Sequence, residues 1–110
     1  MSFDHRAHVR AAWEAVDRHG LAAAAARIPA FLQGFTAAAG VPERYHETVT
    51  WGWLLIVADR MIEGEGFEAF ADRNPDLFDG SPVLARFWRP ETLASERARR
   101  RFVFPDRISQ

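Results

Sequence analysis

The sequence predicts an all-α fold: a compact helical bundle with an up-down-up core of three helices and short C-terminal helices. Two observations favour this class. Apolar residues recur every three or four positions along most of the chain, and no stretch shows the alternation of a half-buried strand. The 110 residues, 48% of them hydrophobic, also match the size of one compact domain, so residues 1–110 are expected to form a single helical domain.

The first helix is expected over residues 4–19. Asp4 is a suitable N-cap and Gly20 a suitable stop. At about 100° per residue the helix is amphipathic, because charged side chains fall opposite an apolar stripe. The stripe consists of Val9, Ala12 and Val16.

Two longer segments complete the predicted core. Residues 21–39 form a second apolar face that ends at Gly40, and Pro29 is expected to kink or split this helix. A third helix is expected from Pro42 to about Glu63, with proline in the favoured first turn. Its middle, WGWLLIVA, is apolar on nearly every side, which identifies it as the central helix.

The remainder predicts shorter helical pieces. They cover residues 67–73, 83–88 and 91–102, and the turn-rich stretch NPDLFDGSP separates the first two. The closing VFPDRISQ is expected to be irregular.

Composition excludes several chemistries. The chain has no cysteine, which removes disulfides, thiolate metal ligands and a cysteine nucleophile. All 14 basic residues are arginine, so Schiff-base chemistry at lysine is excluded. A formal net charge of −1 gives no general attraction to nucleic acid or an anionic membrane. With neither a signal-like start nor a long uncharged apolar run, a cytoplasmic protein is expected.

Two histidines stand at the start of the first helix, in FDHRAHVRAAW. On a helical wheel His5 and His8 lie within about 60° of the apolar stripe that contains Val9. A buried imidazole needs hydrogen-bond partners, because an unsatisfied buried polar group costs about 1–3 kcal/mol. The sequence therefore predicts that something polar faces these histidines.

A third histidine, His46, begins the third helix and is followed directly by Glu47. It shares an apolar stripe with Thr50 and Trp53 at helical spacing. Short connections make neighbouring helices antiparallel, so the first and third helices are expected to start at the same end of the bundle. This topology predicts that His5, His8 and His46 converge in one layer.

Three imidazoles near a carboxylate are typical of a divalent transition-metal site, with Zn²⁺, Cu²⁺, Fe²⁺ or Ni²⁺ as candidates and an open position for a small-molecule ligand or substrate. We therefore take His5, His8 and His46 as candidate ligands and a metalloenzyme as the first hypothesis. The remaining candidates are Glu47 as a general base or fourth ligand, Tyr45 as a donor to a bound oxygen, Thr50, Trp53 and Arg97 as substrate contacts, and Asp106 as a closing residue from the tail.

Other hypotheses remain open for the same residues. Helix N-termini disfavour a cation and favour an anion, so a non-catalytic module that binds a small anionic ligand or a protein partner is the main alternative. A purely structural network is the third, in which the histidines bind Glu47, Thr50 or a main-chain carbonyl. An apolar outer face on the central helix is also consistent with a homodimer.

At these segments the chain resembles a family of small bacterial all-α proteins that carry FxHxxHxxxAW, YHETxT and LxSxxARxxFVxPD. Here the segments read FDHRAHVRAAW, YHETVT and LASERARRRFVFPD, and they span nearly the whole chain. The resemblance implies a shared architecture and a shared site. It places that site at His5, His8, His46 and Glu47, with Ser95, Arg97 and Asp106 as further candidates, and it implies no particular activity.

Overall fold

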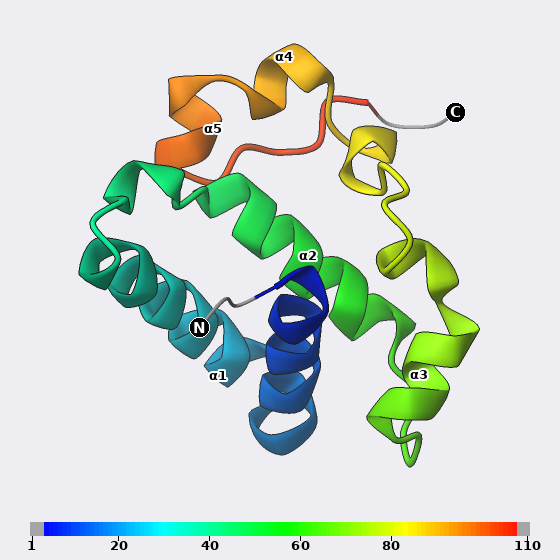
Figure 1. Ribbon diagram of the computed structural model, residues 1–110. Helices are drawn as coiled ribbons and strands as arrows, with labels where there is room; N and C mark the ends of the chain where they lie inside the picture. The colour runs from blue at the N-terminus through cyan, green and yellow to red at the C-terminus, as the bar shows by residue number, and fades with distance from the viewer. Residues whose placement is uncertain (1–3, 108–110) are drawn as a thin grey trace.

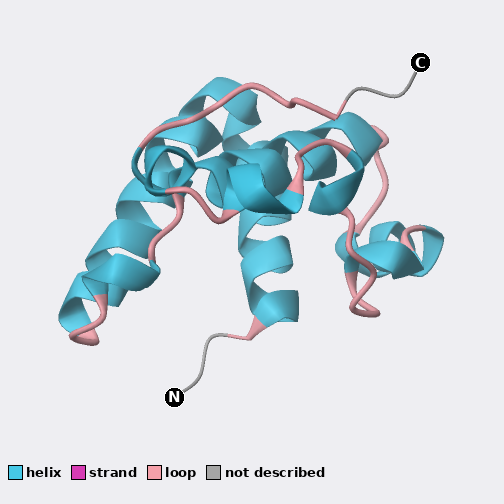
Figure 2. Ribbon diagram, turned by 90° about the horizontal axis from the view of Figure 1, so that it is seen from above, coloured by secondary structure: helices cyan, strands magenta, loops and turns pink. Residues whose placement is uncertain are grey.

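The computed structural model describes residues 4–107, and these contain helices and loops but no strand (Figures 1 and 2). The α-helices are α1 (His5–Ala38), α2 (Glu47–Arg60), α3 (Phe67–Arg73), α4 (Pro90–Leu93) and α5 (Glu96–Arg100). Short 3-10 turns cover Pro42–Arg44, Pro75–Leu77 and Leu84–Arg86. The predicted all-α class is confirmed.

Helix α1 folds back on itself at Gly20, so its two halves form a V (Figure 1). Gly20 has φ +83°, a left-handed conformation that only glycine adopts readily. The Asp4 side chain caps the first half by accepting from the Ala7 amide at 2.9 Å, as predicted. Pro29 was expected to kink or split the second half, and it does not split it, because Gly20 is the only residue of α1 with non-helical backbone angles.

Helix α2 begins later and ends earlier than the sequence predicts. Pro42–Arg44 forms a separate 3-10 turn, and the backbone is extended at Tyr45 and His46 before α2 starts at Glu47. Met61, also extended, ends the helix at Arg60. The two halves of α1 and α2 alternate in direction, and the first half of α1 crosses α2 near its middle (Figure 1).

The main core lies where the first half of α1, α2 and α3 meet. Trp13 packs against Phe67 with ring centroids 5.6 Å apart, and Phe70 and Val57 are fully buried beside them. A smaller cluster joins Ala12 and Ala24, from the two halves of α1, to Leu54 of α2. Small side chains at the inside of the V thus allow α2 to approach both halves.

The C-terminal third of the described chain, residues 75–107, wraps around α2 as short helices and turns joined by irregular segments. The helix expected over residues 91–102 is interrupted, because the Ser95 hydroxyl accepts from the Ala98 amide at 3.1 Å and starts α5 as a new helix. Residues 83–88 form only the turn at Leu84–Arg86. Residues 103–107 are irregular as predicted, and residues 108–110 of that stretch lie outside the described residues. Trp88 Nε1 donates to the Val103 carbonyl at 2.9 Å. Within residues 4–107 no helix has the length and apolar character needed to cross a bilayer.

At Gly52, α2 packs closely against Leu84 and Trp88 of the C-terminal third. A Cβ there would lie 3.0 Å from Leu84 Cδ2 and 3.1 Å from the ring of Trp88, which are both buried. We expect Gly52→Ala to lower the free energy of unfolding by about 1–3 kcal/mol through overpacking. Chemical denaturation measures this change.

Gly34→Ala is the matched control, because Gly34 lies in α1 and an added Cβ would have no neighbouring atom within 4 Å. Alanine should stabilise that exposed helical position by about 0.5–1 kcal/mol. Equal effects of the two substitutions would contradict the close contact at Gly52.

Candidate functional site

A cavity of about 470 Å³ lies between α1 and the first half of α2. Its walls are mostly aliphatic and aromatic, with polar groups among them. The polar lining residues are His5, His8, Thr36, Arg44, Tyr45, His46 and Thr50, and the apolar ones are Val9, Ala12, Ile28, Leu32, Phe35, Ala39, Val41, Val49, Trp53 and Leu54. The three histidines predicted as a site therefore border one cavity.

His46 is the N-cap of α2. Its Nδ1 accepts from the Val49 amide at 3.1 Å, so this nitrogen carries no proton. Its Nε2 then donates to the Leu93 carbonyl at 2.7 Å. The ring is thereby neutral with both nitrogens engaged by main-chain groups. In this arrangement His46 has no nitrogen left for a metal.

His5 and His8 lie at the rim of the cavity and keep exposed surface, rather than pointing into the core stripe as expected. His5 Nε2 lies 2.7 Å from the Leu77 carbonyl oxygen. Since a carbonyl oxygen can only accept, His5 Nε2 is the donor. The partial burial of His8, and next the nearby His5, lower the pKa of His8 and keep it neutral near pH 7.

The three histidines border one cavity, but within residues 4–107 they do not form a group that could hold a metal ion. The His5 ring meets Trp53, with centroids 4.8 Å apart, whereas His46 lies seven residues earlier in the chain. Seven residues correspond to about 10 Å along the axis of α2. The V shape of α1 causes this offset, because its first half crosses α2 near the middle instead of running beside it from the start.

The residues present therefore do not fit the predicted metal centre. Within residues 4–107 no three histidine, aspartate or glutamate side chains gather in a way that could hold a metal ion. His5 and His8 remain near one another, and His46 is occupied in capping.

Tyr45 and Glu47 pair with each other. The Tyr45 hydroxyl donates to the Glu47 carboxylate. Burial raises the pKa of Tyr45 far above its usual value, and the hydrogen bond to this carboxylate adds to the effect. The Thr50 hydroxyl donates to the His46 carbonyl at 2.8 Å. Tyr45 and Thr50 line the cavity, whereas Glu47 is not part of its lining.

The other candidates lie in different places. Trp53 lines the cavity, and Trp51 instead packs on Phe102 with centroids 6.1 Å apart. Arg97 is exposed on α5 and does not line the cavity. Asp106 does fold back, but it accepts from the Arg89 amide at 2.9 Å at the start of α4 and does not line the cavity.

One whole wall of the cavity was not predicted from the sequence. Ile28, Leu32 and Phe35 of the second half of α1 face the cavity, as does Arg44 from the turn that follows. Their helical spacing is visible in the sequence and was interpreted as a face that packs on a neighbouring helix. Only Ala24 and Pro29 of this half are buried, so the face borders a space instead.

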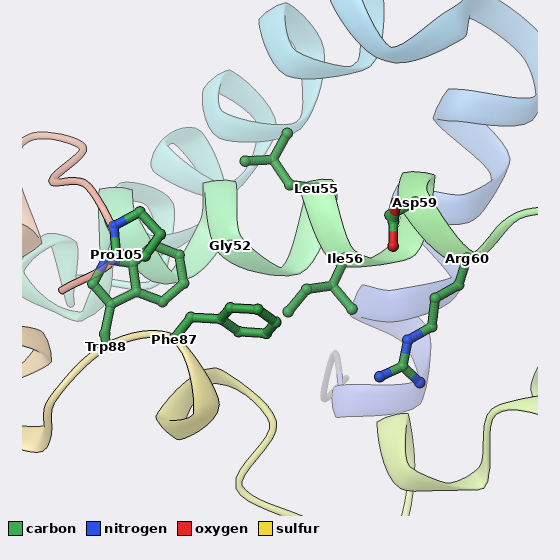
Figure 3. A pocket seen from close by; sticks show the side chains of 8 residues that line it. All are labelled: Gly52, Leu55, Ile56, Asp59, Arg60, Phe87, Trp88 and Pro105. Atoms are coloured by element: carbon green, nitrogen blue, oxygen red, sulfur yellow. The ribbon is translucent and has the colours of Figure 1, made fainter. Parts of the chain in front are cut away.

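A second, smaller hollow of about 300 Å³ lies on another face of α2 (Figure 3). Ile56 and Phe87 face each other across it, and Gly52 and Trp88 lie at one end. Arg60 borders the other end but is already paired with Asp76 at 2.7 Å. None of the predicted site residues lines this hollow.

Tyr45 is the only tyrosine, so its ionisation can be followed by ultraviolet absorbance. We expect no tyrosinate near pH 10 while the protein is folded. The Tyr45 hydroxyl loses its proton at a lower pH in the unfolded chain than in the folded chain. The free energy of unfolding should therefore fall as pH rises above about 10.

Glu47→Gln should bring the Tyr45 pKa down, because the acceptor loses its charge, and Glu43→Gln is the control. Titration of Tyr45 at an ordinary pKa in the folded wild type would contradict the pairing with Glu47.

Comparison with known proteins assigns no activity to the cavity. No protein-family model, curated protein or solved structure matches the chain. The chemistry of the cavity is therefore the guide to its function.

Proposed function

We propose that this protein is a small-molecule-binding module whose ligand occupies the cavity between α1 and α2. The observation that carries the proposal is the cavity itself, about 470 Å³ with apolar walls and a few polar groups. Ligand sites for small organic molecules fall in the range of about 300–1,000 Å³ and have this composition. A ligand there would contact predicted site residues of α1, such as His5, and predicted site residues next to the start of α2, such as Tyr45.

The packing of α1 supports a ligand in this position. The second half of α1 contributes no large side chain to the buried core, since Ala24 and Pro29 are its only buried residues. Its large apolar residues Ile28 and Leu32 are only partly buried and border the cavity. Covering such surface contributes about 25 cal/mol per Å², so an apolar ligand would stabilise this helix against α2.

Binding without catalysis accounts best for the polar groups. Glu47, the candidate general base, accepts from Tyr45 and does not line the cavity, and His46 uses both ring nitrogens on main-chain groups. A general base needs a free acceptor within reach of the proton it takes. The catalytic candidates instead hold the cavity wall in place.

The ligand proposal can be tested with 1-anilinonaphthalene-8-sulfonate, a fluorescent anion with an apolar body. We expect folded protein to bind it, and Leu32→Trp to weaken binding by about ten-fold or more, since the indole fills the cavity. Ala30→Trp is the matched control on the exposed side of the same helix. Near-ultraviolet circular dichroism verifies that each variant keeps its tertiary packing.

Failure of the wild type to bind the probe would contradict the proposal. Equal affinity in Leu32→Trp and the wild type would place the probe elsewhere and contradict it as well.

A divalent transition metal remains the competing hypothesis, and elemental analysis of untagged protein tests it. The engaged nitrogens of His46 lead us to expect no stoichiometric zinc, copper, iron or nickel. We also expect His46→Ala to lower the free energy of unfolding by about 1 kcal/mol, because α2 loses its cap. Stoichiometric metal that disappears in His46→Ala would favour the metal site over the ligand proposed here.

A further inference from the structure

The described lining of the cavity includes a positively charged side chain and no negatively charged one. Among residues 4–107, no aspartate or glutamate lines it, and Arg44 is its only arginine. His46 is neutral because its Nδ1 accepts an amide proton, and the lowered pKa of His8 keeps that ring uncharged near pH 7. A cationic ligand would find no counter-charge on these walls, whereas an anionic group would find one.

Arg44 is also unpaired. Its guanidinium makes no hydrogen bond or ion pair with any residue in the described range 4–107. Other arginines are held by carboxylates, for example Arg60 by Asp76 at 2.7 Å and Arg73 by Glu65 at 2.8 Å. The acidic neighbours of Arg44 in the chain are Glu43 and Glu47. The second of these already accepts from Tyr45, and the first has no ion pair with Arg44.

Most other donors on the cavity wall are already used. The Thr36 hydroxyl donates to the Leu32 carbonyl at 3.0 Å, and the Thr50 hydroxyl donates to the His46 carbonyl at 2.8 Å. The Tyr45 hydroxyl and the Nε2 protons of His5 and His46 are likewise engaged. The guanidinium N–H groups of Arg44 are therefore the main donors on the cavity wall that have no partner.

This donor supply limits the kind of anion. A phosphate monoester carries nearly two charges and three acceptor oxygens, and one guanidinium would replace little of its hydration. A carboxylate carries one charge, and its two oxygens match the two parallel N–H bonds of a guanidinium fork. The head group that suits this cavity is a single carboxylate.

The rest of the cavity suits an apolar body. Between the turn that carries Arg44 and the ring of Trp53 the walls include Leu32, Val49 and Leu54. The seven residues from His46 to Trp53 span about 10 Å of helix axis. An apolar chain or ring system of about this length can lie along the wall.

We propose that the ligand is a monocarboxylate with an apolar body of medium length, whose carboxylate pairs with Arg44 while its body lies between the second half of α1 and α2. This assignment rests on the proposed function of the cavity. It adds the head group, the body and the residue that distinguishes between ligands.

Three probes with one tail and different heads test the proposal: decanoate, decanol and decylamine. Isothermal titration calorimetry on the untagged chain, below the concentrations at which these molecules form micelles, gives each affinity. We expect decanoate to bind at least about ten-fold more tightly than decanol, and decylamine to bind most weakly. Raised salt should weaken decanoate and leave decanol unchanged.

Arg44→Gln should reduce the decanoate affinity to that of decanol and leave decanol binding intact. Arg101→Gln is the matched control, because Arg101 is an exposed arginine, likewise without a side-chain partner in residues 4–107, outside the cavity. It should leave both affinities unchanged, and circular dichroism of both variants monitors folding.

Equal binding of decanoate and decanol to the wild type would overturn the carboxylate assignment but not the cavity as a ligand site. An equal loss in Arg44→Gln and Arg101→Gln, or tighter binding of inorganic phosphate than of decanoate, would overturn the carboxylate assignment too. Absence of binding by all three decyl probes and by the fluorescent anion would instead reject the cavity as a ligand site.

Discussion

The reversal of α1 at Gly20 is the constraint on which the cavity depends. A residue with a side chain rarely adopts φ +83°, and this angle turns the second half of α1 back toward α2. Small residues on both sides of the turn, Ala12 and Ala24, let Leu54 fill the inside of the V. Farther from Gly20 the two halves diverge, and the space between them and α2 is the cavity.

Two of the histidines hold this frame together through hydrogen bonds to main-chain carbonyls. His5 donates to the carbonyl of Leu77, just after α3, and His46 donates to the carbonyl of Leu93, the last residue of α4. Each bond joins segments more than 40 residues apart in sequence and satisfies a carbonyl outside regular helix pairing. Each of these two hydrogen bonds contributes about 0.5–1.5 kcal/mol net to stability. Together they fix the two ends of the cavity wall to the C-terminal third.

Local signals in the sequence predicted what local interactions decide. The Asp4 cap, the break at Gly20 and the helix at Phe67–Arg73 follow from residue type and spacing, and the structure has all three. The start of α2 was missed because histidine is an unusual N-cap, and its partner Val49 N–H gives no sequence signal. A helical wheel gives direction around an axis but not where two helices cross, so the meeting of His5 with Trp53 could not be predicted.

The location of Arg44 connects the charge of the cavity to its apolar wall. Arg44 ends the short turn after Gly40, and this turn is tied to α1 by the bond from the Val41 amide to the Thr36 carbonyl at 2.9 Å. The apolar wall and the unpaired guanidinium therefore belong to one continuous segment between Gly20 and the His46 cap. A ligand that pairs with the guanidinium and covers the wall contacts this segment at both ends. Because such a ligand binds the folded arrangement only, its binding energy adds directly to the stability of the sparsely packed half of α1.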